Sequence, residues 1–393
     1  MSKKILTVLL VVCMALVGVL VSGCGGGGTK ESIKIGGIFD LTGGLADMGA
    51  LIEKGATLAV EEINAAGGVL GGSNLTLLSE DGATSADTGF NAFKKLVEVN
   101  GVQVVVGPMI SGAVLSIGPY AEQNEVPLIS PSATSPLIAV QDWKPWALRT
   151  CTGDQFQGEV IAGIILDEGY NRTAIIVQNT PYGVGLEQVV TNELTGAGKV
   201  VVKSIEYDES KLDYLTELQA IKDANPDVIV QVGYHTDSAV VYEQADSLGL
   251  DTIPWLVAEG VYGLQAETYP AAAAFMAKDN LRGCTLIPEA EAPAYAAFKA
   301  AYEARWGVPA GVYCDTAYDA VKLIAKAIDK AGAYNGTAIK DALYDVGASY
   351  SGASGAINWN NIGDRAHATY GVWDYVETEP GVYEYQILYN VEF

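Results

Sequence analysis

The sequence predicts an α/β protein with two lobes, each built on a doubly wound parallel sheet. Short runs of β-favouring residues alternate with helical patterns of about 10–16 residues from residue 33 onward, as in βαβ units whose helices cover both faces of a sheet. The same alternation starts again after residue 150. The chain has 393 residues, 49% of them hydrophobic, which is more than a single core usually serves. Two similar halves therefore fit the length.

The first half is predicted to begin and end with a strand. Its first helix stops at Gly67 and Gly68, because glycine is typical of helix C-termini. Its third strand stops at Gly107 and Pro108. The expected strands span 33–39, 75–79, 102–106 and 126–130, and the expected helices span 51–66, 86–99 and 113–123.

The second half is predicted to begin with a helix and to repeat the same alternation. The last stretch, 357–393, is rich in turn residues and β-favouring residues, so we expect β-structure there. The expected strands span 173–178, 200–206, 228–232, 255–258 and 282–287, and the expected helices span 156–166, 185–194, 214–224, 239–248, 293–306 and 315–331.

The residues that follow these strands predict a binding cleft. Small hydroxyl residues follow the strands of the first half, and aromatic or acidic residues follow those of the second. They are Ser111, Ser132, Ala133, Thr134, Tyr182, Tyr234 and Glu259. Because ligands bind beyond the carboxyl ends of parallel strands, we expect one cleft between the lobes that closes on a small zwitterion. Hydroxyls and main-chain N–H groups would hold its carboxylate, and Glu259 would pair with its ammonium.

The composition excludes several other classes of function. The formal net charge is −24, so the basic surface that nucleic acid requires is missing. No GxSxG, Walker or HExxH motif occurs, and the two histidines lie far apart, so we expect no enzyme activity, no cofactor and no metal. An enzyme remains the rival class, which a turnover assay on amino acids and amides would expose.

The N-terminus resembles that of a bacterial lipoprotein. A short basic start with Lys3 and Lys4 precedes the apolar run 5–21, and Ser22 and Gly23 stand directly before Cys24. The pattern predicts a signal peptide over 1–23, lipid modification of Cys24, and a flexible tether over 24–32. An uncleaved membrane anchor is the alternative. Both place the rest of the chain outside the cytoplasm, on the outer face of the cell membrane or in the periplasm.

The chain resembles the type I periplasmic binding proteins of the branched-chain amino-acid (leucine-isoleucine-valine) family. The resemblance runs from about residue 33 to the end, through stretches in the family's order such as "VVVGPMISGA", "VPLISPSATSP", "LRTCTGDQFQG", "AEGVYG" and "GAINWNNIGDRAHATYGVW". It implies a monomeric solute-binding protein that captures an apolar amino acid between its lobes and delivers it to the permease and ATPase subunits of an ABC importer. A ligand-sensing receptor of the same fold, for amides or short organic acids, is the alternative.

The resemblance also implies roles for individual residues. Ser111 and Thr134 would hold the ligand carboxylate, with main-chain groups of Ser132 and Ala133 beside them. Tyr182 and Tyr234 would form aromatic walls of the site, and Glu259 would pair with the ligand ammonium. Relatives often carry an aromatic residue where this chain has Met48, which leaves the choice of ligand side chain open.

In this family three strands cross between the lobes, and the crossings would fall near Thr150, Ile287 and Gly371. Lobe 1 would then comprise 33–150 and 288–370, and lobe 2 would comprise 151–287 and 371–393. Cys151 and Cys284 both stand near expected crossings, so a disulfide between them is a further hypothesis, with free thiols as the alternative.

Overall fold

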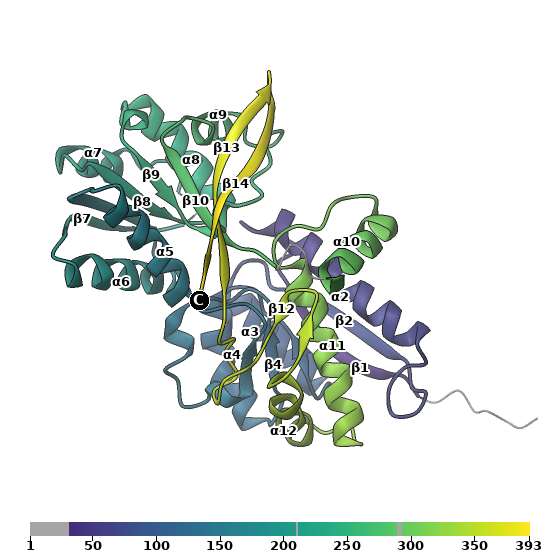
Figure 1. Ribbon diagram of the computed structural model, residues 1–393. Helices are drawn as coiled ribbons and strands as arrows, with labels where there is room; N and C mark the ends of the chain where they lie inside the picture. The colour runs from purple at the N-terminus through teal and green to yellow at the C-terminus, as the bar shows by residue number, and fades with distance from the viewer. Residues whose placement is uncertain (1–30, 210, 289–292) are drawn as a thin grey trace, which may run out of the picture.

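The fold consists of two lobes, each built on its own sheet (Figure 1). The structure is a computed structural model that describes residues 31–209, 211–288 and 293–393. Lobe 1 contains a five-stranded sheet in the order β2-β1-β3-β4-β5, and all of its strand pairs are parallel. Its strands are β1 (Ile33–Phe39), β2 (Leu75–Asp81), β3 (Val105–Val106), β4 (Leu128–Ser130) and β5 (Ala147–Arg149).

Helices cover both faces of the lobe 1 sheet. Alternate strand residues serve the two faces: Val104 and Val106 belong to one apolar cluster, and Val105 belongs to the other. The helices are α2 (Ala46–Ala65), α3 (Ala86–Glu98), α4 (Ser111–Gln123), α10 (Pro293–Trp306), α11 (Cys314–Ala331) and α12 (Gly336–Gly347). Short elements complete the lobe: η1 (Pro136–Ile138), η2 (Lys144–Trp146), β11 (Ser351–Gly352) and β12 (Gly355–Ala356).

Lobe 2 contains a seven-stranded sheet in the order β14-β13-β10-β9-β8-β6-β7. Its inner strands run parallel, and the C-terminal hairpin β13–β14 pairs antiparallel at one edge. The strands are β6 (Arg172–Gln178), β7 (Val200–Tyr207), β8 (Val228–Val232), β9 (Trp255–Val257), β10 (Leu281–Leu286), β13 (Thr369–Glu379) and β14 (Val382–Glu392). The helices are α5 (Asp154–Asp167), α6 (Pro181–Gly196), α7 (Leu215–Asp223), α8 (His235–Ser247) and α9 (Pro270–Met276), with short turns η3 (Leu250–Thr252) and η4 (Glu259–Val261).

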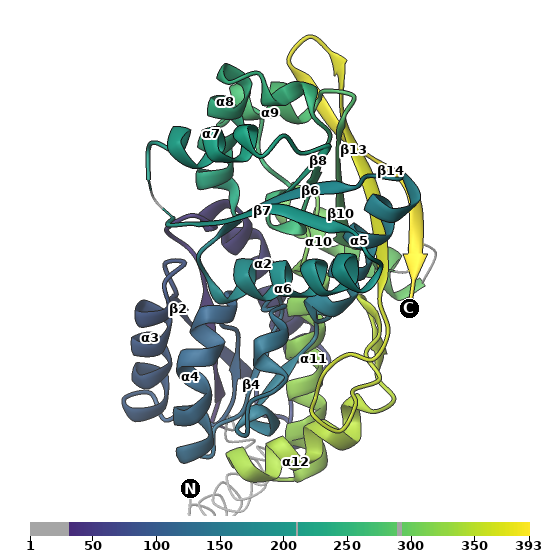
Figure 2. The same ribbon diagram turned by 90° about the vertical axis from the view of Figure 1, so that its left-hand side faces the viewer.

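The chain passes between the two sheets at three places (Figure 2). It leaves lobe 1 between β5 and α5, returns between β10 and α10, and leaves again before β13. Residues that follow the carboxyl ends of β3, β4, β6, β8 and β9 line the region between the lobes. The predicted fold class, two doubly wound parallel sheets in an α/β chain, is confirmed.

Two boundaries differ from the sequence-based expectation for a physical reason. The first helix begins at Ala46, five residues before the expected start, and it includes Gly49. A Cβ atom at this glycine would lie 1.9 Å from the carbonyl oxygen of Asp40, so the close approach of helix and loop requires glycine despite its low helix propensity. The helix expected from residue 185 begins at Pro181, because Thr180 caps it by accepting a hydrogen bond from the Gly183 N–H at 3.2 Å.

The three cysteines of the described residues are free and buried. The hypothesis of a Cys151–Cys284 disulfide is therefore wrong. Both side chains lie in the apolar cluster that joins the two lobes, and the Cys151 thiol donates to the Ala133 carbonyl at 3.6 Å. Free buried cysteine commonly behaves as a small apolar side chain.

The predictions for residues 1–23, for lipid modification of Cys24 and for most of the tether lie outside the described residues. Within the described part of the chain, no helix is both long enough and apolar enough to cross a membrane.

Candidate ligand-binding site

A pocket lies between the two lobes. It is lined by Leu45, Met48, Met109, Ser111, Ser132, Thr134, Tyr182, Tyr234, Glu259, Gly260 and Tyr313. Seven of the eight residues predicted from the sequence are among them; Ala133 is the exception.

The Ser111 hydroxyl lines the pocket and donates no hydrogen bond to any of the described residues. Ser111 is the first residue of α4, and its Oγ accepts a hydrogen bond from the Ser135 N–H at 3.2 Å. Because the oxygen accepts there, its own O–H can donate elsewhere. Ser132 differs, since its hydroxyl already donates to the Met109 carbonyl at 3.1 Å. Ser111 is therefore the hydroxyl best able to donate to an anionic group.

Thr134 offers its main-chain N–H instead of its hydroxyl proton. Its Oγ1 donates to Asp154 Oδ2 at 3.0 Å, so the hydroxyl can only accept a further hydrogen bond. No hydrogen bond from the Thr134 N–H occurs among the described residues. Asp154 is fully buried, and burial together with the charge of Glu259 raises its pKa well above the ordinary value.

Ala133 does not reach the pocket, which corrects the expectation that its main-chain groups face the ligand. The residue is fully buried. Its N–H donates to Ser130 Oγ at 3.0 Å, and its carbonyl accepts from Arg149 at 3.3 Å. Both main-chain groups are therefore used within lobe 1, where they fix the loop that carries Ser132 and Thr134.

Two tyrosines form the wall on the side of lobe 2. Tyr182 lies in the first turn of α6 and Tyr234 directly precedes α8. Their rings are stacked, with centroids 5.5 Å apart. The Tyr182 hydroxyl accepts a hydrogen bond from the Gly260 N–H at 3.2 Å, which fixes the ring beside Glu259.

Apolar side chains from lobe 1 complete the pocket. Leu45 and Met48 come from the start of α2, and Met109 follows β3. All three are buried. Methionine adapts to side chains of different shape, so this surface suits an apolar group of a ligand.

Glu259 is a buried carboxylate with one unpaired oxygen. The residue is 2% exposed. Its Oε2 accepts from the Leu286 N–H at 3.3 Å, whereas Oε1 has no partner among the described residues. Burial raises the pKa of Glu259 to about 7, and the Leu286 N–H together with the nearby polar groups of Tyr313 and Gln157 limits the rise, although the latter two lie outside hydrogen-bond geometry to the carboxylate. A ligand cation would pair with this oxygen and stabilise the ionised form.

Four lining residues were not predicted: Leu45, Met109, Gly260 and Tyr313. Leu45 and Gly260 stand beside predicted positions, so reading the whole turn around Met48 and Glu259 would have found them. Tyr313 gives no such signal, because it follows no strand. It directly precedes α11, after the chain has returned to lobe 1. Its φ is 65°, and its hydroxyl has no hydrogen-bond partner among the described residues.

The chain matches known proteins over most of its length. Residues 32–374 match a family model described as "Periplasmic binding protein". A Leu/Ile/Val-binding protein of Rhizobium johnstonii, BraC3, is 30% identical over 347 residues, which cover 87% of this chain and 91% of that protein. The leucine-, isoleucine-, valine-, threonine- and alanine-binding protein of Pseudomonas aeruginosa is 28% identical over 349 residues, or 88% of this chain and 90% of that protein.

The fold matches solved structures of the same kind. The branched-chain amino-acid transporter substrate-binding protein LivJ of Streptococcus pneumoniae, solved in complex with isoleucine, superimposes with a TM-score of 0.77 at 27% identity. The match covers 91% of this chain and 99% of that one. These relatives are named as binding proteins, which confirms the prediction of a binding protein over an enzyme. The chain belongs to the periplasmic binding protein family.

Proposed function

We propose that this protein captures an apolar α-amino acid, branched-chain or similar, between its two lobes and delivers it to the permease and ATPase subunits of an ABC importer. One observation carries the proposal. The pocket sets the unpaired buried carboxylate oxygen of Glu259 on one lobe against the donors Ser111 O–H and Thr134 N–H on the other. Such a pocket complements a zwitterion. The names of the relatives support the same ligand class.

The carboxylate of the ligand binds to the Ser111 hydroxyl and the Thr134 N–H, close to the N-terminus of α4. The positive end of the helix dipole favours an anion there. The Ser132 hydroxyl contributes only acceptor lone pairs, because its proton is used.

The ammonium of the ligand pairs with Glu259. No lysine or arginine side chain of the described residues forms an ion pair with Glu259, so the ligand itself supplies the counter-charge. The Thr134 Oγ1 lone pairs provide a second acceptor. The ligand side chain then packs against Met48 and Met109 and the stacked rings of Tyr182 and Tyr234.

The identity of the bound molecule tests this proposal. Mass spectrometry of the ligand that co-purifies with the protein should detect a leucine, isoleucine or valine mass. Calorimetry with these amino acids should give tighter binding than with isocaproate, with isobutyramide or with benzoate. An amide or an organic acid as the preferred ligand would support the sensing receptor instead. Turnover of any of these compounds would overturn the assignment as a binding protein.

We also propose the lobe limits expected from the sequence, with lobe 1 over 33–150 and 288–370 and lobe 2 over 151–287 and 371–393. The placement of β5, β10 and β13 in the two sheets supports these limits to within a few residues.

We propose that the protein is a monomer held at the outer membrane face by a lipid on Cys24. Cys24→Ala should release the protein from the membrane fraction and leave amino-acid binding unchanged. Cys13→Ala is the matched control, because this cysteine lies within the proposed signal peptide. A Cys24→Ala protein that resists detergent-free washing would favour the uncleaved anchor, and a dimer mass in light scattering would contradict the monomer.

A further inference from the structure

Arg149 is a buried arginine that binds three successive carbonyls of the loop carrying Thr134. It ends β5 and is fully buried. Its Nη1 donates to the carbonyl oxygens of Ala133, Thr134 and Ser135 at 3.3, 3.0 and 3.0 Å. This loop forms one wall of the ligand pocket, but Arg149 itself does not line the pocket.

The direction of these carbonyls fixes the direction of the N–H groups. In a planar trans peptide unit the C=O and the following N–H point in opposite directions. When the Ala133 carbonyl points to Arg149, the Thr134 N–H points away from it. When the Thr134 carbonyl points to Arg149, the Ser135 N–H points to Ser111 Oγ, to which it donates at 3.2 Å. That hydrogen bond leaves the Ser111 hydroxyl proton for the ligand.

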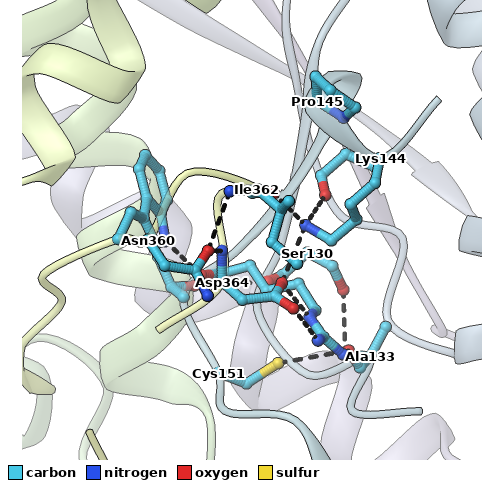
Figure 3. Close-up of polar contacts among 12 residues, drawn as sticks. Ser130, Ala133, Lys144, Pro145, Cys151, Asn360, Ile362 and Asp364 are labelled. Atoms are coloured by element: carbon cyan, nitrogen blue, oxygen red, sulfur yellow. Dashed lines mark hydrogen bonds and ion pairs between the residues drawn. The ribbon is translucent and has the colours of Figure 1, made fainter. Parts of the chain in front are cut away.

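The guanidinium is itself held in place. Both carboxylate oxygens of Asp364 accept hydrogen bonds from it. Oδ1 accepts from Nε at 2.7 Å, and Oδ2 accepts from Nη2. Lys144 Nζ lies 2.9 Å from Asp364 Oδ1 and also donates to the carbonyls of Ala147 and Ile362. Figure 3 shows Asp364 facing Lys144, with Ala133 and Cys151 beside it. Burial alone would raise the pKa of Asp364, but the two cations hold it below its ordinary value.

We propose that Arg149 is the positioning residue for the ligand carboxylate: it orients the Thr134 N–H and, through Ser135, the Ser111 hydroxyl toward the bound anion. The proposal rests on the proposed function, because it assumes a ligand with a carboxylate. Lysine cannot replace Arg149 here. Five N–H donors in a planar fork serve three carbonyls and a carboxylate together, whereas an ammonium has three donors without that geometry.

The test compares ligands that differ only in the carboxylate. Calorimetry would use leucine against leucinamide, and isocaproate against its amide, on the parent, on Arg149→Lys and on a control, Arg172→Lys. Arg172 also donates to two main-chain carbonyls, Ala224 and Asn225, but it is exposed and does not line the pocket. A purely structural role for Arg149 would weaken both members of a ligand pair equally.

We expect Arg149→Lys to weaken leucine binding on the order of tenfold or more, since hydrogen bonds to a charged group are affected. Leucinamide binding should change by less than about threefold, and Arg172→Lys should change neither. An equal loss for leucine and leucinamide, or a leucine affinity unchanged by Arg149→Lys, would overturn the proposal.

Two further outcomes separate the inference from the proposed function. If the parent binds isocaproate and not leucine, the amino-acid assignment fails, and the isocaproate pair still decides the role of Arg149. If the parent prefers neither carboxylate over its amide, both fail.

If Arg149→Lys does not fold, Asp364→Asn decides instead: it keeps the shape of the side chain but removes the charge that fixes the guanidinium, and it should weaken only the carboxylate ligands. Equal weakening of both members of each pair would overturn the inference.

Discussion

Tyr182 and Tyr234 lie stacked in the wall of the pocket, with ring planes only 3° apart and centroids separated by 5.5 Å. They follow the neighbouring strands β6 and β8, so the parallel order of the sheet places them side by side. Burial raises the pKa of both phenols well above the ordinary value, and both rings are neutral at physiological pH. The pair therefore forms a flat, uncharged surface opposite the apolar residues of lobe 1.

The first prediction concerns this wall. Tyr182→Ala should weaken leucine binding by on the order of tenfold to a hundredfold, because it removes a large apolar contact and leaves Tyr234 without its stacking partner. Tyr182→Phe should cost less than about tenfold, since only the hydrogen bond from the Gly260 N–H is lost. Calorimetry measures both changes. Equal affinities of the alanine variant and the parent would show that the ligand does not touch this wall.

The second prediction concerns pH. The pKa of Glu259 is about 7 without ligand, and an ammonium beside it favours the ionised form. Binding below about pH 7 should therefore release a proton, and the affinity for leucine should rise by up to tenfold per pH unit between about pH 5 and 7 and then level off. Titrations in two buffers of different ionisation enthalpy measure the released proton.

Glu259→Gln is the control for this pH dependence. It removes the carboxylate and keeps the shape of the side chain, so its weaker binding should show a flatter profile over the same range. Asp154 also has a raised pKa. Asp154→Asn would therefore show whether any pH dependence that remains in Glu259→Gln comes from Asp154. An affinity of the parent that is independent of pH would contradict the proposed ammonium partner.

The third prediction concerns stability. Asp40 is buried, its Oδ1 accepts from the Thr84 N–H at 3.0 Å, and its Oδ2 has no partner among the described residues. Burial raises the pKa of Asp40 from 3.8 to about 7. Between these values the folded state binds more protons than the unfolded state, so the contribution of Asp40 to stability falls as the pH rises.

Asp40→Asn should therefore raise the unfolding free energy at about pH 7.5, by at most about 4 kcal/mol, and leave it nearly unchanged at about pH 4. Thermal or urea unfolding at the two pH values measures the difference. Asp142→Asn is the exposed control. A stabilisation of equal size at both pH values would point to a cause other than the titration of Asp40.

The fourth prediction concerns motion. Because the pocket is lined from both lobes, saturating leucine should favour a closed arrangement and reduce the radius of gyration in small-angle scattering. Glu259→Ala at the same leucine concentration should keep the larger radius. A radius of the parent that leucine does not change would argue against closure.

The sequence predicts most of this fold, because strands and helices alternate with clear periodicity and the strand ends show which residues face the cleft. Glu259 and Tyr234 are found in this way from local pattern alone. Tyr313 is not, since it reaches the pocket only because the chain returns to lobe 1 and enters α11 there. Likewise, nothing in the local sequence shows that the Thr134 hydroxyl donates to Asp154, 20 residues further along the chain.

The most direct test of the proposed amino-acid site is calorimetry of leucine binding to the parent, to Glu259→Ala and to Thr134→Ala. Removing one partner of a buried charge pair typically costs about 2–5 kcal/mol, so Glu259→Ala should weaken binding by about 30-fold to several thousand-fold. Thr134→Ala should cost less, because the main-chain N–H that holds the carboxylate remains. A Glu259→Ala protein that binds leucine within about threefold of the parent would contradict a ligand held by both of its charged ends.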